Sequence, residues 1–336
     1  MLSELLFLSL GTAVLIRLLR RYAPALHLID IPNQRSFHRR QTPRGAGIAF
    51  VLIALIDLLI FHRDFWVTHW PVLVAMATIL GVGFLDDRHD APPRLKFLVI
   101  AVATLILWDD GLVIDEVGRY FGTDLRLGWL ALPFTLFAVT GFTNALNLVD
   151  GLDGLAGSLA LAILGGFYWL GVLHHDPMLS TLSLAFGIGV LIFLFFNWNP
   201  ASIFMGDSGS LTLGFLISLL SIHALNYLPS VSVLYIGAVP LLDTLTTMIR
   251  RKRQGRSATA PDRCHIHHLL VRRTGSVPQA VLWIMQLQLI LMLIGLLLPR
   301  EIDQTLPLIL FLLIVWGSYL LVQREIRRQG IDCYPE

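Results

Sequence analysis

Long uninterrupted apolar segments are the feature of this sequence that most restricts its fold. They run for about 17 to 25 residues, the length at which an α-helix crosses the roughly 30 Å hydrocarbon core of a bilayer. Only helices or closed barrels satisfy their backbone hydrogen bonds in lipid, and these segments lack the alternation of barrel strands. With 55% hydrophobic and 14% charged residues, the chain is predicted to be an all-α, polytopic membrane protein.

Eleven transmembrane helices are predicted. The expected spans are residues 2–19, 45–61, 70–85, 95–108, 129–148, 155–173, 179–196, 209–226, 232–249, 279–298 and 307–322. The first is not expected to be a cleaved signal peptide, because its apolar run is too long. No soluble domain is visible between the spans, so residues 1–336 are interpreted as a single integral membrane domain.

Basic residues are distributed unevenly between the two sets of connections. With the amino terminus outside, loops 20–44, 86–96 and 250–277 and the tail from 323 carry 20 Lys and Arg, against 4 in the opposite connections. Short cytoplasmic loops retain positive charge, so the first set is assigned to the cytoplasm. Both cysteines, Cys264 and Cys333, fall on this side, where thiols stay reduced, and no disulfide is expected.

Every dense polar cluster falls on the cytoplasmic face of this topology. The clusters are RSFHRRQTPRGAG (35–47), FLDDRHD (84–90), NALNLVDGLDGLAGS (144–158), FNWNPASIFMGDSGS (196–210) and DRCHIHH (262–268). Acids at membrane depth are costly and usually functional. We therefore expect these five segments to converge on one active site at the cytoplasmic face.

The FLDDRHD motif places Asp86 and Asp87 side by side at the end of a span, with Asp90 one turn later. If the helix continues, Asp86 and Asp90 share a face while Asp87 points about 100° away. Close carboxylates favour a cation, and Mg²⁺ is bound through one or two carboxylates plus substrate phosphates. The alternative is a solvated helix end with Arg88 and Arg94 as counter-ions.

In MGDSGS, Asp207 lies between two glycines at the start of a span. A glycine-flanked turn into a helix offers free N–H groups to an anion, and Asp207 can hold a metal beside that anion. The alternative is that Asp207 caps the helix. Asn144 and Asn147 lie three residues apart and can face one site, where an amide oxygen can ligate a hard cation.

The remaining polar residues suit a substrate better than a metal. Asp150 and Asp153 can accept hydrogen bonds from a base or a sugar, although Asn, Asp and Gly also favour a simple turn. His265, His267 and His268 lack the cysteine pair of a zinc site, so phosphate binding or proton transfer is favoured. A loop without a ligand is the alternative for the histidines.

Taken in order, TPRGAG, FLDD, NALNLVDGLDGLAG, NWNPASIFMGDSGS, PLLDTL and HIHH resemble the polyprenyl-phosphate N-acetylhexosamine-1-phosphate transferases, glycosyltransferase family 4, over nearly the whole chain. The resemblance implies that a UDP-linked N-acetylated sugar and undecaprenyl phosphate give a lipid-pyrophosphate-linked sugar and UMP. It also implies Mg²⁺ (or Mn²⁺ as a substitute), the bacterial inner membrane, and initiation of O-antigen or another cell-envelope polysaccharide.

The resemblance assigns a role to each motif. Asp86 and Asp87 match the catalytic pair, one of which orients the lipid phosphate or accepts its proton, and Asn147 and Asp207 match the magnesium positions. The predicted substrate contacts are Arg44, Lys96, Asn144, Asp150, Asp153, His265, His267 and His268. Two departures from the family pattern are Ala46, where relatives often have a third glycine, and the absence of a lysine three residues after the aspartate pair. Lys96 is the candidate for that charge.

Two other classes of function fit parts of the sequence. DDRHD also fits the diphosphate motif of an intramembrane prenyltransferase, but such an enzyme is expected to carry a second aspartate-rich motif. A transporter would explain acids in membrane helices, including Asp243, although transporter sites lie near the midplane between internal repeats. Asp243 is instead expected to pair with Arg250 or Arg251. The bilayer and the two substrates are the predicted partners, nucleic acid is not expected, and a homodimer is left open.

Overall fold

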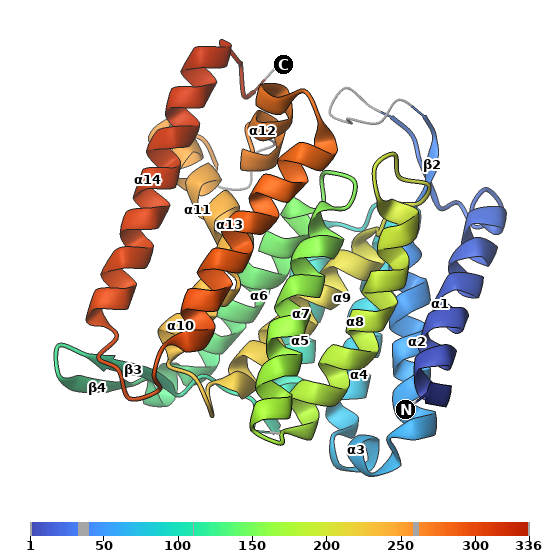
Figure 1. Ribbon diagram of the computed structural model, residues 1–336, viewed down its shortest axis with the longest axis horizontal. Coiled ribbons are helices and arrows are strands. Elements are labelled where there is room, and N and C mark those ends of the chain that lie inside the picture. The colour runs from blue at the N-terminus through green and yellow to red at the C-terminus, as the bar shows by residue number, and fades with distance from the viewer. Residues whose placement is uncertain (1, 33–39, 110, 258–261, 335–336) are drawn as a thin grey trace. The chain divides into compact units, whose positions relative to one another are not determined.

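The computed structural model describes residues 2–32, 40–109, 111–257 and 262–334. Within these ranges the chain is mainly helical, with two short strand pairs (Figure 1). Residues 35–39 of the first predicted polar cluster lie outside them. The chain divides into two compact units, residues 1–116 with 127–227 and residues 117–126 with 228–336. The interpretation as a single domain stays a prediction.

The first unit holds the helices up to α9. Its elements are α1 (Leu2–Tyr22), β1 (Ile29–Asp30), β2 (Thr42–Pro43), α2 (Ala46–Phe61), α3 (Arg63–Thr68), α4 (Trp70–His89), α5 (Pro93–Asp109), the 3-10 turn η1 (Gly128–Leu130), α6 (Ala131–Val149), α7 (Leu155–Leu173), α8 (Pro177–Asn197) and α9 (Asp207–Ala224). Strands β1 and β2 pair antiparallel just before α2.

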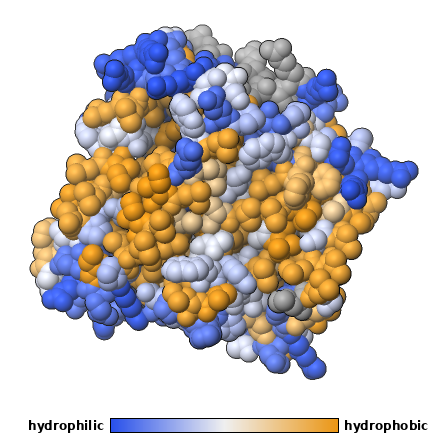
Figure 2. Space-filling view, viewed as in Figure 1, coloured by the Kyte–Doolittle hydropathy of each residue, from blue (hydrophilic) through white to orange (hydrophobic). Residues whose placement is uncertain are grey.

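The predicted spans recur as helices, but their predicted number is not confirmed. The described residues contain seven helices long and apolar enough to cross a membrane, or eight if one bent pair is a single span. That pair, α10 (Ser230–Ile236) and α11 (Ala238–Arg253), occupies the span predicted at 232–249 and bends by 84°. Figure 2 shows apolar side chains over the middle of the helices and hydrophilic ones toward their ends, as in a multi-pass membrane protein.

Helix α9 is the buried centre of the first unit. All its residues from Ser208 to Ile222 are buried, and α2, α4, α6 and α7 pack against it. A helix with apolar or small side chains on every face can be enclosed on all sides. The first turn of α9 is therefore held firmly where the predicted acidic motifs end.

Glycines allow the neighbouring helices to approach the first turn of α9 closely. A methyl group on Gly83 of α4 would lie 2.5 Å from the Cα of Ser208, and one on Gly47 of α2 would overlap the backbone of Gly209. The N–H of Gly47 also donates to the carbonyl of Met205 at 2.9 Å. TPRGAG and FMGDSGS are thus brought together within this unit.

The second unit contains the C-terminal helices and one hairpin. Its elements are β3 (Glu116–Tyr120), β4 (Thr123–Arg126), α10, α11, α12 (Ile266–Thr274), α13 (Val277–Leu297) and α14 (Thr305–Gln329). Tyr235 and Leu242 lie in its buried core with Phe311, so α10 and α11 both pack against α14.

Cys264 and Cys333 form a disulfide with their Cα atoms 5.3 Å apart, so the expectation of reduced thiols is wrong. The tail after α14 returns to the segment before α12, where the N–H of Arg263 donates to the carbonyl of Cys333 at 3.2 Å. The two cysteines are 69 residues apart. Only the fold brings them together, because nothing in their spacing predicts the return of the tail.

Candidate active site

Asp87 holds the start of α9. Its side chain, 2% exposed, accepts the N–H of Asp207 at 2.7 Å and the N–H of Ser208 at 3.0 Å. The first N–H groups of a helix have no partner inside it, so Asp87 caps α9 from another helix. Gly206 occupies the N-cap position of α9 and has no side chain that could cap the helix. Asp207 is therefore not the cap, and two N–H groups predicted to bind an anion are bonded to Asp87.

The backbone at Gly206 accommodates this capping carboxylate. Gly206 has φ of 75°, and a methyl group on it would lie 2.5 Å from Oδ1 of Asp87. Only glycine adopts this conformation readily and leaves room for the acid. The first glycine of MGDSGS, Gly206, is thus required by Asp87, which lies 120 residues before Asp207.

Asp207 projects from the first turn of α9 between two donors. Its Oδ1 accepts the amide N–H of Asn147 of α6 at 3.0 Å, and its Oδ2 accepts the ammonium of Lys96 of α5 at 2.9 Å. The Asn147 amide also donates to the hydroxyl of Ser210 at 2.8 Å. Three segments far apart in sequence, two of them predicted to bind metal, meet at this carboxylate.

Lys96 joins the acidic pair to Asp207. Its ammonium lies 3.2 Å from Oδ2 of Asp86, and the three side chains are 14 to 24% exposed. The lysine neutralises part of the repulsion between the two carboxylates. This is the position where the departure from the family motif led us to expect a positive charge.

This acidic cluster has the donors that a divalent cation needs. Asp86 and Asp207 offer carboxylate oxygens and Asn147 an amide oxygen, the hard ligands that Mg²⁺ prefers. The Asn147 amide now directs its nitrogen at Asp207. It must turn over before its oxygen can face an ion.

Asp150 and Asp153 follow α6 but differ in their surroundings. Burial, followed by the negative charges of Asp207, Asp87 and Asp153, raises the pKa of Asp150 to about 7. Asp153 accepts the N–H of Ala201 and the amide of Asn199, both at 2.9 Å. Asp153 thus fixes the loop between α8 and α9, whereas Asp150 lies among the other acids.

Three polar residues lie at the margin of this cluster. Asn144 donates its amide to the carbonyl of Thr140 in its own helix at 2.7 Å. Helix α4 ends at His89, so the helix does not continue as it would have to for Asp90 to share a face with Asp86. The Asp90 side chain is 91% exposed and lies 3.8 Å from the guanidinium of Arg44.

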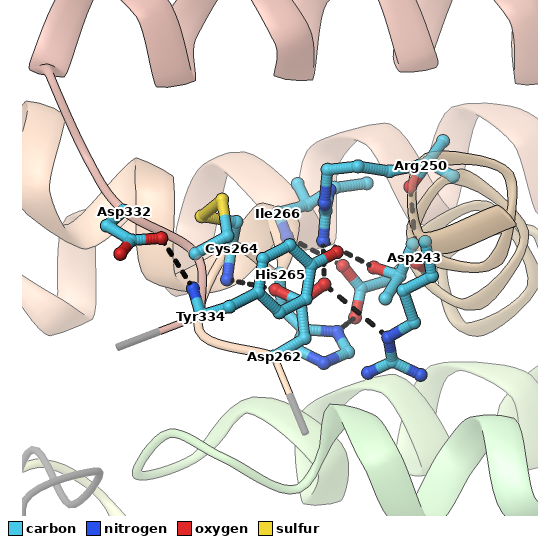
Figure 3. Close-up of polar contacts among 12 residues, drawn as sticks. Asp243, Arg250, Asp262, Cys264, His265, Ile266, Asp332 and Tyr334 are labelled. Atoms are coloured by element: carbon cyan, nitrogen blue, oxygen red, sulfur yellow. Dashed lines mark hydrogen bonds and ion pairs between the residues drawn. A yellow bond between two sulfur atoms is a disulfide. The ribbon is translucent and has the colours of Figure 1, made fainter. Parts of the chain in front are cut away.

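The predicted histidines form a cluster around Asp243 in the second unit. Nδ1 of His265 lies 2.7 Å and Nδ1 of His267 3.7 Å from Oδ2 of Asp243, while Oδ1 accepts the N–H of Ile266 at 2.6 Å. Figure 3 shows His265 and Ile266 turned toward this carboxylate. The meeting of the histidines with the acids of the first unit stays a prediction.

The histidines differ in charge. Burial lowers the pKa of His265, but the negative charge of Asp243 outweighs burial and raises it overall. Burial, followed by the charge of His268, lowers the pKa of His267 well below its usual value. Burial, followed by the charge of His265, lowers the pKa of His268 to about 4. Protonation is therefore favoured at His265 and disfavoured at His267 and His268.

Among the contacts of the described residues, Asp243 pairs with the histidines, where the sequence led us to expect Arg250 or Arg251. The Arg250 guanidinium contacts Asp262 at 2.5 Å (Figure 3), whereas the Asp243 carboxylate contacts His265. Sequence reasoning missed this role because Asp243 and His265 are 22 residues apart. The only signal was an acid in the apolar PLLDTL segment, where an unpaired carboxylate is costly.

Comparisons with known proteins agree with the sequence resemblance. The pattern of the family described as "Glycosyl transferase family 4" matches residues 69–225, which include Asp87, Asn147 and Asp207. A Bacillus subtilis (strain 168) protein named "Probable undecaprenyl-phosphate N-acetylglucosaminyl 1-phosphate transferase" is 35% identical over 78% of this chain and 75% of its own length.

Two further relatives carry the name undecaprenyl-phosphate alpha-N-acetylglucosaminyl 1-phosphate transferase. The Yersinia pestis protein is 32% identical and the Escherichia coli (strain K12) protein 31% identical, each over 93% of this chain and 88% of its own length. These matches extend through both structural units. The chain therefore belongs to glycosyl transferase family 4.

Proposed function

We propose that this protein transfers an N-acetylated sugar 1-phosphate from a UDP-sugar to undecaprenyl phosphate, releasing UMP, at the cytoplasmic face of a bacterial inner membrane. The observation that carries the proposal is the cluster of Asp86, Asp207, Asn147 and Lys96 around the Asp87-capped start of α9. The names of the relatives support the lipid acceptor and the sugar phosphate. Family membership favours this reaction over the prenyltransferase and transporter alternatives.

The reaction joins two anions, so the site must first permit their approach. An oxygen of the lipid phosphate forms a bond to the β-phosphorus while the bond to the α-phosphate oxygen breaks, and the electron pair leaves with UMP. Mg²⁺, held by Asp207 and Asn147, supplies positive charge to the pyrophosphate when bound. Lys96 adds a fixed cation beside the reacting groups.

The two adjacent aspartates are assigned different roles. Asp86 faces Lys96 and is partly exposed, so it can orient the lipid phosphate or accept its proton. Both oxygens of Asp87 accept N–H groups of α9. Asp87 is therefore a positioning residue, which sets the direction of Asp207. The histidines around Asp243 are proposed to contact the substrate phosphates.

UMP release tests the proposal. The purified protein with Mg²⁺, undecaprenyl phosphate and a panel of UDP-N-acetylated sugars should release UMP with at least one of them. Asp207→Asn should reduce the rate by at least about 100-fold, as loss of a charge-stabilising group does. Asp90→Asn is the matched control, because this nearby acid is exposed and lies outside the cluster, and its rate should stay within about twofold.

Two results would contradict the proposal. One is the absence of UMP release across the whole panel by protein that is folded, as judged by a cooperative thermal transition. The other is full activity of Asp207→Asn. The panel also identifies the sugar, and a membrane-impermeant label applied from the periplasm should fail to reach residues near Asp87 or Asp207.

A further inference from the structure

A second cluster of metal-binding side chains lies in the first unit, away from the acids at the start of α9. It consists of Glu4 in α1, Asp57 in α2 and His62 between α2 and α3. Nε2 of His62 lies 2.8 Å from Glu4 Oε1 and 3.8 Å from Asp57 Oδ2. The three ligand atoms all lie within 4.8 Å of one another.

Asp57 is the residue that points to a missing ligand. It is 0% exposed, and among the described residues neither of its carboxylate oxygens has a hydrogen-bond partner. Its helix is apolar along most of its length, from Ala46 to Phe61. A buried carboxylate without donors is strongly disfavoured unless an opposite charge compensates for it.

The His62 side chain does not compensate for this carboxylate by itself. Its Nε2 lies 2.8 Å from Glu4 Oε1 but 3.8 Å from Asp57 Oδ2, beyond the length of a hydrogen bond. A divalent ion between the three side chains would bring opposite charge to the Asp57 carboxylate and would bind the imidazole in its neutral form, as a metal ligand requires.

We propose that Glu4, Asp57 and His62 bind a divalent transition-metal ion, with Zn²⁺ as the ion that fits best. Imidazole and carboxylate together suit zinc, whereas Mg²⁺ and Ca²⁺ prefer oxygen alone. Tetrahedral zinc holds its ligand atoms roughly 3.4 Å apart, which follows from bonds of about 2.1 Å. The present separations of the His62 nitrogen from Glu4 and Asp57, 2.8 and 3.8 Å, lie on either side of that value.

The site is open to solvent on the side of His62, and its ligands come from two helices that pack together and the residue that follows one of them. The His62 side chain is 26% exposed, whereas that of Asp57 is 0% exposed, so an ion enters past the imidazole. Once bound, it joins the beginning of α1 to the end of α2. Because α1 and α2 pack together, the ion acts as a cross-link between them.

This site is separate from the acidic cluster at α9. Gly47, at the start of α2, contacts the first turn of α9, whereas Asp57 lies ten residues further along the same helix, or about 15 Å. The two clusters also differ in chemistry, because only this one contains an imidazole. An excess of Mg²⁺ can therefore fill the oxygen-rich cluster while zinc is measured here.

Zinc binding to the full-length protein in detergent tests the proposal. The protein is stripped with a chelator and titrated with Zn²⁺ in excess Mg²⁺, and bound zinc is counted per chain. Wild type should bind one Zn²⁺ more than Asp57→Asn and than His62→Gln, with affinity at the site lowered at least about tenfold in each variant. Zinc held by the histidines around Asp243 contributes equally to all proteins.

Asp64→Asn is the matched control, since it makes the same chemical change at an exposed acid two residues after His62. It should bind as much zinc as wild type. Zinc should also raise the thermal midpoint of wild type and Asp64→Asn more than that of the two site variants. Equal zinc content and equal thermal shifts in wild type and His62→Gln would overturn the proposal, even if Asp57→Asn fails to fold.

Discussion

The acidic cluster of the first unit and the histidine cluster of the second are built in opposite ways. In the first, several carboxylates each receive fixed donors: Asp87 two backbone N–H groups, and Asp207 an amide and an ammonium. In the second, the single carboxylate of Asp243 contacts the imidazole of His265 and accepts the backbone N–H of Ile266. Fixed negative charge dominates one cluster and neutral imidazole the other.

The difference teaches how each cluster is held in place. The positions of the acids depend on the close approach of the α2 and α4 backbones to α9, which glycines make possible. The histidines depend on one buried acid that orders the loop before α12. The first cluster should therefore be sensitive to added volume and lost caps, and the second to protonation.

The largest effect on stability is expected for Asp87→Ala. Removing this carboxylate leaves two buried N–H groups of α9 without an acceptor, at a cost of about 4 kcal/mol. Asp86→Ala is the matched variant, because the Asp86 carboxyl group bonds to the side chains of Lys96 and Asp207, whereas that of Asp87 bonds to the backbone of α9. Thermal unfolding should separate the two variants clearly, and equal midpoints would mean that Asp87 does not cap α9.

The next largest effect concerns pH and the histidine cluster. His268 has a folded pKa of about 4, below its usual 6.5, so the unfolded chain binds more protons between these values. Its contribution to stability is present above pH 6.5 and is lost as pH falls toward 4, by roughly 3 kcal/mol.

His268→Gln should remove this part of the acid sensitivity. The check is the thermal midpoint of wild type and variant at pH 8, 6 and 4.5, where the variant should decline less steeply. An identical decline in both proteins would show that His268 is not held neutral by burial.

The smallest effect is expected for volume added next to α9. Gly83→Ala places a methyl group 2.5 Å from the Cα of Ser208, so α4 must shift, at a cost of about 2 kcal/mol. Gly81→Ala lies in the same helix with nothing within 4 Å of the added carbon, and should be neutral or slightly stabilising. Comparable loss in both variants would contradict the close packing of α4 on α9.

Much of the candidate site was predictable because its residues stand next to apolar spans. Asp86, Asn147 and Asp207 each mark the end or start of a helix, and the expectation that these segments meet is confirmed for the first unit. Lys96 was expected as a substitute charge and as a substrate contact, and the structure places it between two acids. Its position could not be read from the sequence because helix α5 has to pack before the lysine reaches Asp207.

The sequence by itself determined a polytopic helical membrane protein, its family and the positions of its polar motifs, because hydropathy and motif order are properties of neighbouring residues. Only the tertiary structure decided that Asp87 caps α9, that the Asp90 side chain is exposed and that Asp243 contacts His265. It also decided the bend between α10 and α11 and the pairing of Cys264 with Cys333. Such contacts join residues far apart in the chain, so they depend on how helices pack and not on local pattern.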